Sequence, residues 1–150
     1  MSASLKDRIR EDMTQALKAG DKVRLGALRL LTAAITNREK ELRHELSDDE
    51  VRDVAGKEAK KRTESIEAFD AAGRTELAAR ERAERDVLTP FAPAQLAEAE
   101  VDAIIDEALT STGASSLRDI GKVMGVVMGR AKGRLDGAAV QRKVRARLEG

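Results

Sequence analysis

The residues of this chain best suited to chemistry form a short basic segment near its C-terminal end. Lys132 and Arg134 lie in a glycine-containing stretch before Asp136, a residue type favoured at the start of a helix. Backbone N–H groups and the helix dipole at such an N-terminus attract anions, so the two cations could contact phosphate groups. The same stretch is equally compatible with an ordinary turn, in which Gly133 ends one helix and Asp136 caps the next.

Three glycines, Gly121, Gly125 and Gly129, are spaced four residues apart just before this segment. On a helix this spacing puts them on one side, although each glycine costs about 1 kcal/mol relative to alanine. Their smooth surface would let another backbone approach closely. Tight packing against a neighbouring helix is the simpler explanation, and a ligand surface is the alternative.

These two features give the candidate interface. The basic residues that we expect to contact nucleic acid are Lys122, Arg130, Lys132 and Arg134. The glycines that would allow close approach are Gly121, Gly125 and Gly133.

The rest of the chain offers little for catalysis. It has no cysteine, which excludes thiolate nucleophiles, thiolate metal sites and disulfides. Its one histidine, His44, follows an expected helix end, where it would interact with the helix dipole. Asp102, Asp106 and Glu107 could share a helix face but lack the further ligands that a metal ion needs, so we expect a solvated surface. We predict no catalytic residue, metal or cofactor.

The formal net charge of +1 hides an uneven distribution over the 150 residues. Residues 118–150 hold nine bases and three acids (+6), whereas residues 94–117 hold five acids and no base. Residues 1–46 carry a net charge of +3 and residues 47–93 a net charge of −3. The basic tail could bind phosphate or form a solvated helical surface.

Length and hydropathy exclude a membrane protein. No apolar run approaches the roughly 18 residues that a membrane span needs, and the first residues lack the apolar core of a signal peptide. We therefore expect a cytoplasmic protein with no membrane partner.

The elements that position these residues are helices throughout. Apolar residues recur at helical spacing, starting with Leu5, Ile9, Met13 and Leu17. Helix caps are expected at Ser4, Asp21, Ser47, Ser116 and Asp136, and helix ends at Gly20, Gly73 and Gly113. The second helix is apolar on two faces, which places it at the centre of a bundle.

The long third helix has an almost entirely polar middle, from Lys57 to Glu64, which we expect to be an exposed arm. A fourth helix is expected over residues 75–88. After it, both prolines of the chain fall in residues 90–93, and proline cannot donate to a helix ladder. We therefore predict an all-α protein: an N-terminal bundle of about four helices (1–89), a linker (90–93) and a three-helix domain (94–150) whose first helix spans 96–110.

Two long motifs resemble those of the GatB/YqeY family, and of stand-alone YqeY-like proteins in particular. The C-terminal motif reads Thr112-Gly113-Ala114-Ser115-Ser116-Leu117-Arg118-Asp119-Ile120-Gly121-Lys122-Val123-Met124-Gly125 and continues at Lys132-Gly133-Arg134-Leu135-Asp136-Gly137. The N-terminal half agrees at Asp21-Lys22-x-Arg24-Leu25, Leu28-Arg29-Leu30-Leu31 and Lys60-Lys61-Arg62-x-Glu64-Ser65-Ile66. The sequence departs from the usual pattern at Ala97, where a capping Ser is common, and at Leu135, which replaces a frequent Ala.

The resemblance implies a C-terminal domain similar to the tail domain of the B subunit of glutamyl/aspartyl-tRNA amidotransferase. That enzyme converts mischarged Glu-tRNA(Gln) or Asp-tRNA(Asn) to the amide form with glutamine as nitrogen donor. Its tail domain recognises tRNA, and its active sites lie in parts that this chain lacks.

Three functions follow as hypotheses. The first is a non-catalytic module that binds tRNA or a tRNA-bearing complex through the C-terminal domain, reading shape and backbone because no Tyr or Trp can stack on bases. The second, which the resemblance implies, is glutamine-dependent carbon–nitrogen ligation as an accessory to an amidotransferase, with an amidotransferase or synthetase as partner. The third is a protein-interaction adaptor with no RNA partner.

Overall fold

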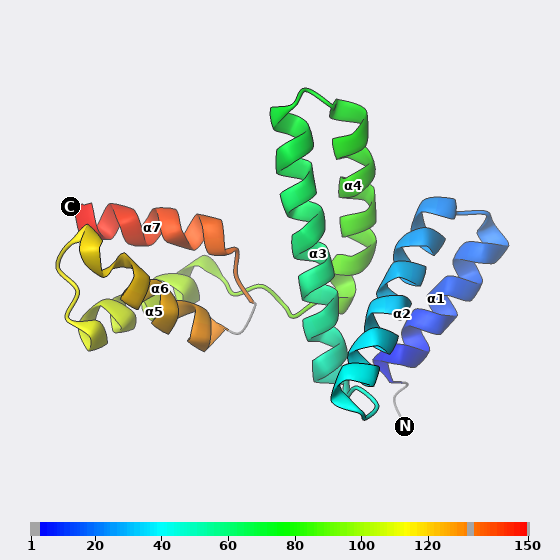
Figure 1. The fold of residues 1–150 in the computed structure, drawn as a ribbon, viewed down its shortest axis with the longest axis horizontal. Helices are drawn as coiled ribbons and strands as arrows, with labels where there is room; N and C mark the ends of the chain where they lie inside the picture. The colour runs from blue at the N-terminus through cyan, green and yellow to red at the C-terminus, as the bar shows by residue number, and fades with distance from the viewer. Residues whose placement is uncertain (1–3, 132–133, 150) are drawn as a thin grey trace. The chain divides into compact units, whose positions relative to one another are not determined.

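The computed structural model describes residues 4–131 and 134–149, and all regular structure in these ranges is helical. This confirms the expected all-α fold. The chain divides into two compact units, Met1–Pro93 and Ala94–Gly150 (Figure 1). No helix in the described part of the chain is long and apolar enough to cross a membrane.

Four α-helices and one short 3-10 helix build the N-terminal unit. They are α1 (Leu5–Ala19), α2 (Lys22–Leu42), α3 (Asp48–Ala71), α4 (Thr75–Leu88) and η1 (Thr89–Phe91). In Figure 1, α1 and α2 form one antiparallel hairpin and α3 and α4 form another. The number of α-helices is the expected one.

Side-chain caps start three of these helices as predicted. Ser4 accepts a hydrogen bond from the Asp7 N–H at 3.1 Å, and Asp21 accepts one from the Arg24 N–H at 3.0 Å. Ser47 forms a full capping box, because Glu50 also accepts from the Ser47 N–H. These caps satisfy N–H groups that have no partner inside their own helix.

The core of the N-terminal unit forms on one face of α2. Leu28, Leu31 and Ile35 are buried there, and α2 contacts each of the other three α-helices. This confirms its predicted central place. The second apolar face of α2 is covered only in part, since Val23 and Leu30 keep 42% and 49% of their surface exposed.

The apolar stripe predicted for α1 is wrong at its end. Leu17 is 62% exposed, and Ala16 is buried in its place. Each step of four residues advances 400° around a helix of 3.6 residues per turn, so the stripe drifts by about 40° per step. Over the three steps from Leu5 to Leu17 the drift carries the last leucine out of the core.

The polar middle of α3 is not an exposed arm. It packs against α4, and the Arg62 side chain is only 12% exposed. Arg62 donates to Glu58 at 3.0 Å and lies 3.5 Å from a carboxylate oxygen of Glu84 on α4. The sequence pattern missed this packing because long charged side chains cover a neighbouring helix with their apolar stems.

The segment after α4 belongs to the N-terminal unit. Phe91, which ends η1, is buried in the same core as Leu88 and Val51. A Cβ added to Gly56 would lie 3.1 Å from the Pro93 ring, so Pro93 also packs closely on α3. Contacts of this kind hold residues 89–93 against the bundle.

Three α-helices and a 3-10 turn build the C-terminal unit. They are α5 (Glu98–Thr112), η2 (Leu117–Asp119), α6 (Ile120–Ala131) and α7 (Gly137–Glu149). Its core contains the fully buried Ile105, Ala108, Val123, Val127 and Val144. All five are aliphatic, in keeping with a chain that has only two Phe and no Trp or Tyr.

Two details of this unit differ from expectation. Helix α5 begins at Glu98 and not at residue 96, and its cap residue Ala97 has no side-chain oxygen to accept a hydrogen bond. Ser116 makes no side-chain cap either. Asp119 makes a different contact: its carboxylate accepts a hydrogen bond from the Ser115 N–H at 3.1 Å, which holds the chain that precedes the helix. The Asp136 cap forms as predicted, through the Ala138 N–H.

Candidate nucleic-acid interface

Helix α6 places the glycines on the side away from the core. Val123, Val127 and Ala131 are buried on one side of α6, whereas Gly121, Gly125 and Gly129 are exposed. With 100° per residue, the glycines fall on the opposite side of the helix from the valines. We call these three residues the glycine ridge.

No part of the described chain packs on the glycine ridge. A Cβ built at Gly121, Gly125 or Gly129 would have no heavy atom outside its own helix turns within 4 Å. The predicted packing of a neighbouring helix on these glycines is therefore wrong within the described chain. The glycines face away from the core because Val123 and Val127, on the opposite side of α6, pack toward α5 and α7.

Because nothing in the described chain packs on the ridge, the direction in which a substitution there changes the free energy of unfolding can be predicted. Replacing Gly125 with alanine is expected to raise the free energy of unfolding by about 0.5–1 kcal/mol, because alanine is the better helix former and its methyl group meets open space. Chemical denaturation followed by circular dichroism measures the change. A destabilised variant would mean that a surface packs on the ridge after all.

Lys122 lies beside the glycine ridge and close to Arg118. Neither cation has an ion-pair partner among the described residues. Both lower the pKa of Asp119, although the largest cause of that lowered pKa is the hydrogen bond from the Ser115 N–H. Two cations and the carboxylate of Asp119, which accepts the hydrogen bond from the Ser115 N–H, thus gather at the start of α6. Sequence reasoning omitted Arg118, and its spacing of four residues from Lys122 was the signal for it.

Arg130 does not join this group. It follows Lys122 by eight residues, so it lies more than two turns further along α6, about 12 Å away along the axis. There it forms an ion pair with Glu107 of α5. The structure therefore separates Arg130 from Lys122.

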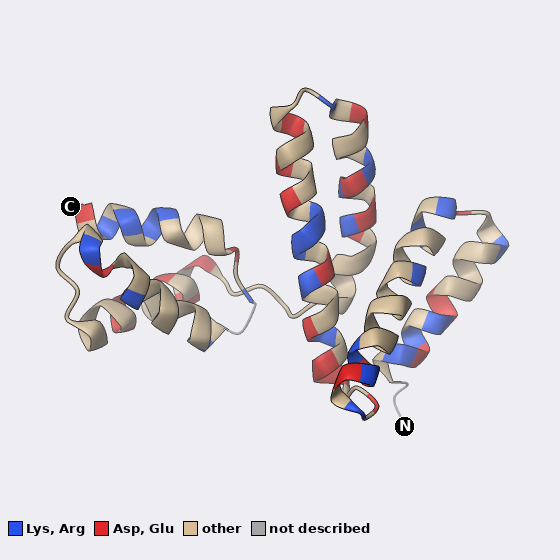
Figure 2. Ribbon diagram, viewed as in Figure 1, with Lys and Arg blue, Asp and Glu red and all other residues tan. Residues whose placement is uncertain are grey.

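Most of the remaining basic tail is also paired within the C-terminal unit. Lys143 of α7 lies 3.0 Å from Glu98 and 2.9 Å from Asp102 of α5, and Arg147 pairs with Asp106. The hydrogen bonds to Asp102 and then Glu98 raise the pKa of Lys143. Figure 2 shows the acidic residues of α5 and the basic residues of α7.

This pairing adds to the interpretation of both charge runs. Asp102, Asp106 and Glu107 of α5 lie on the solvated surface as expected, with side chains 49–60% exposed, and each also forms an ion pair with a base of α6 or α7. Residues 94–150 together hold nine bases and eight acids, so the unit is almost neutral. Arg118, Lys122, Arg134 and Arg142 are the bases of this unit that form no ion pair among the described residues.

Arg134 has a structural contact. Its Nε donates to the Ala94 carbonyl oxygen at 3.0 Å, and its own carbonyl accepts from the Leu96 N–H at 2.7 Å. These bonds hold the segment before α5 against the start of α7, and they leave the remaining guanidinium nitrogens exposed. Lys132 and Gly133 lie outside the described residues.

The described residues contain no group of three His, Cys, Asp or Glu that could hold a metal ion. His44 is exposed, with Nδ1 2.7 Å from the Glu45 carbonyl oxygen and Nε2 3.6 Å from Glu50. These contacts place it in the turn between α2 and α3, next to the capping box.

The fold and the exposed ridge define an all-α protein with a helical-hairpin unit and a three-helix unit that carries a glycine-rich surface. Comparison with known families identifies it further: residues 6–148 match the family described as Yqey-like protein. The chain belongs to this family, and the resemblance of its motifs is confirmed.

One curated relative was found at 31% identity over 140 residues. It is Altered inheritance of mitochondria protein 41, mitochondrial, from Pyrenophora tritici-repentis. The alignment covers 91% of this chain and 77% of the relative. The name of this relative places it in mitochondria, and a cytoplasmic location for the present chain stays a prediction.

Proposed function

We propose that this protein is a non-catalytic module that binds tRNA, or a complex carrying tRNA, through the start and the exposed side of α6. The observation that carries the proposal is the glycine ridge, which no described part of the chain covers, next to Arg118 and Lys122, which form no ion pair among the described residues. Three glycines in one helix lower its stability by about 1 kcal/mol each, so a bound backbone is a reason for their presence.

The ligand is read by shape. A ridge without side chains lets a sugar-phosphate backbone approach α6, and Arg118 and Lys122 supply charge at one end. Arg134 contributes its exposed nitrogens, while Arg130 is committed to Glu107. Nothing at the ridge can stack on a base, which supports a contact with backbone and 2′-hydroxyl groups.

The binding should depend on salt, but only modestly. Each phosphate that a cation neutralises contributes about −0.7 to −0.9 to the slope of log affinity against log salt concentration. Four of the eight bases described in the C-terminal unit form no ion pair there, namely Arg118, Lys122, Arg134 and Arg142, so we expect a slope on the order of −2 to −4. Fluorescence anisotropy of labelled tRNA, titrated at several salt concentrations, measures it.

A charge-matched pair of variants tests the location. The double substitution Arg118→Ala and Lys122→Ala should weaken binding about tenfold and reduce the slope by about 1 to 2. The control, Arg8→Ala with Arg74→Ala, removes two exposed bases from the N-terminal unit and should bind as the parent does.

The ridge itself is tested by Gly125→Leu. This variant should stay folded, because the position is open, and should lose RNA affinity. Salt-independent binding, or equal affinity in all these variants, would favour the protein-adaptor function instead. Glutamine hydrolysis by the purified chain at an enzyme-like rate would favour the carbon–nitrogen ligase function.

A further inference from the structure

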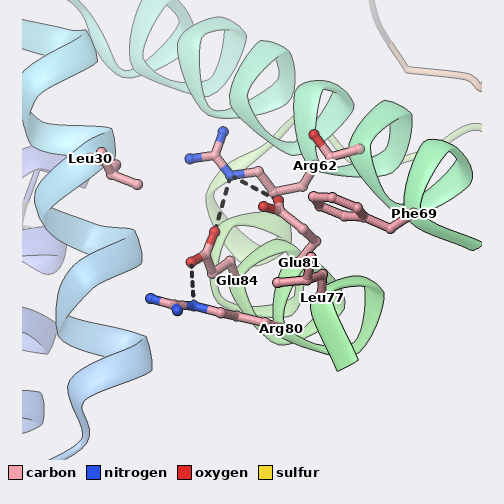
Figure 3. A pocket seen from close by; sticks show the side chains of 8 residues that line it. Leu30, Arg62, Phe69, Leu77, Arg80, Glu81 and Glu84 are labelled. Carbon is pink, nitrogen blue, oxygen red and sulfur yellow. Dashed lines mark ion pairs between the residues drawn. The ribbon is translucent and has the colours of Figure 1, made fainter. Parts of the chain in front are cut away.

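The N-terminal unit has an open groove between its two helical hairpins. The groove has a volume of about 380 Å³, and α2 supplies one wall while α3 and α4 supply the other (Figure 3). Leu30 lies on the first wall, and Phe69 and Leu77 lie on the second. Leu30 and Leu77 are two of the five large apolar residues that are exposed in the described chain. The groove therefore combines three apolar side chains, which the unit leaves partly uncovered, with the polar side chains of Arg62, Ser65, Arg80, Glu81 and Glu84.

Two carboxylates give the groove its polar character. Glu81 and Glu84 are mostly buried, and both depend on the single guanidinium of Arg62, whose Nε lies 3.9 and 3.5 Å from them. These distances exceed those of charge-assisted hydrogen bonds, about 2.7–2.9 Å. Arg80 reaches Glu84 only at 3.8 Å and is largely exposed, so it can be displaced. An occupant with a cation between apolar side chains would complement this wall.

The turn between α1 and α2 has this composition. Leu17 and Val23 are exposed on either side of it, and the bases Lys18 and Lys22 have no ion-pair partner among the described residues. The net charges agree as well, since residues 1–46 carry +3 and residues 47–93 carry −3. The α1–α2 turn thus presents exposed apolar and basic side chains, which complement the exposed apolar side chains and the carboxylates on the α3–α4 wall of the groove.

We propose that two copies of this chain associate through their N-terminal units, each inserting its α1–α2 turn into the groove of the other. The Leu17 and Val23 side chains cover Leu30, Phe69 and Leu77, and Lys18 and Lys22 approach Glu81 and Glu84. A two-fold axis makes both contacts equivalent and closes the assembly at a dimer. The dimer buries the apolar residues that a lone unit exposes to water.

Sedimentation of the full chain at moderate salt tests this proposal. The parent protein should be a dimer that dissociates on dilution. The double substitution Lys18→Glu and Lys22→Glu should raise the dissociation constant at least about tenfold, because it places like charges beside Glu81 and Glu84. A control with the same change in net charge, Lys40→Glu with Lys60→Glu, alters exposed bases outside the groove and should dimerise as the parent does.

Chemical cross-linking tests the register. Because the chain has no cysteine, Leu17→Cys and Leu77→Cys can be prepared separately, mixed and treated with a short bis-maleimide. A covalent product should join the two different variants in preference to two copies of either one. A parent that stays monomeric at all concentrations, a dimer indifferent to the Lys18 and Lys22 changes, or cross-links that join only Leu17→Cys to itself would each overturn the proposal.

Discussion

Replacing Leu28 with alanine is expected to lower the free energy of unfolding of the N-terminal unit by about 2–5 kcal/mol. Leu28 is fully buried on α2, in the core that α1, α3 and α4 share. The substitution removes its transfer free energy and leaves a cavity, because the close-packed surroundings relax only in part. Urea denaturation, followed by the exchange of backbone amides in α2, measures the loss.

The control for this substitution is Leu17→Ala on α1. Leu17 is the most exposed large apolar residue of the described chain, so its removal should change stability by less than about 0.5 kcal/mol in dilute protein. Because the core of the C-terminal unit is separate, exchange at the amides of α5 and α6 should be unaffected by either variant. A loss below about 1 kcal/mol for Leu28→Ala would contradict the described core.

Replacing Phe91 with alanine is expected to cost the N-terminal unit about 3–5 kcal/mol, the usual range for a buried phenylalanine. Phe91 belongs to the same core as Leu88 although it follows the last α-helix of that unit. Its aromatic ring is one of only two in the chain, so no other side chain of similar size can fill the space. Thermal and urea denaturation measure the effect.

The neighbouring Pro90 provides a control. Its side chain is exposed, so Pro90→Ala should change stability by no more than about 0.5–1 kcal/mol, through the conformational freedom of the unfolded chain. If Phe91→Ala cost as little, residues 90–93 would be a linker that merely touches the bundle.

Local signals in the sequence predicted the helices well. Ser4, Asp21, Ser47 and Asp136 accept the hydrogen bonds that their residue types favour, and Gly20 ends α1 with φ of 71°, a left-handed conformation that suits glycine. Each of these contacts joins residues within one turn of helix. Such contacts depend on residue type and spacing alone, so the sequence is enough to predict them.

Contacts between distant residues could not be predicted in the same way. The side of α6 that faces solvent depends on where α5 and α7 lie, so the spacing of the glycines fixed their alignment and left their environment open. The pairing of Arg130 with Glu107 likewise depends on the packing of α5 on α6. The burial of Arg62 could not be predicted for another reason. Its charge predicts an exposed side chain, whereas the apolar part of that side chain packs on α4.

The charge pairs between α5 and α7 have a consequence for the kinetics of the C-terminal unit. They join residues 41 to 45 positions apart, so they form only after the intervening chain has folded back on itself. Contacts absent from the folding transition state leave the folding rate almost unchanged and slow the reverse reaction. We therefore expect removal of these pairs to speed unfolding of the C-terminal unit more than it slows folding, and by a small factor, because the paired side chains are 34–80% exposed.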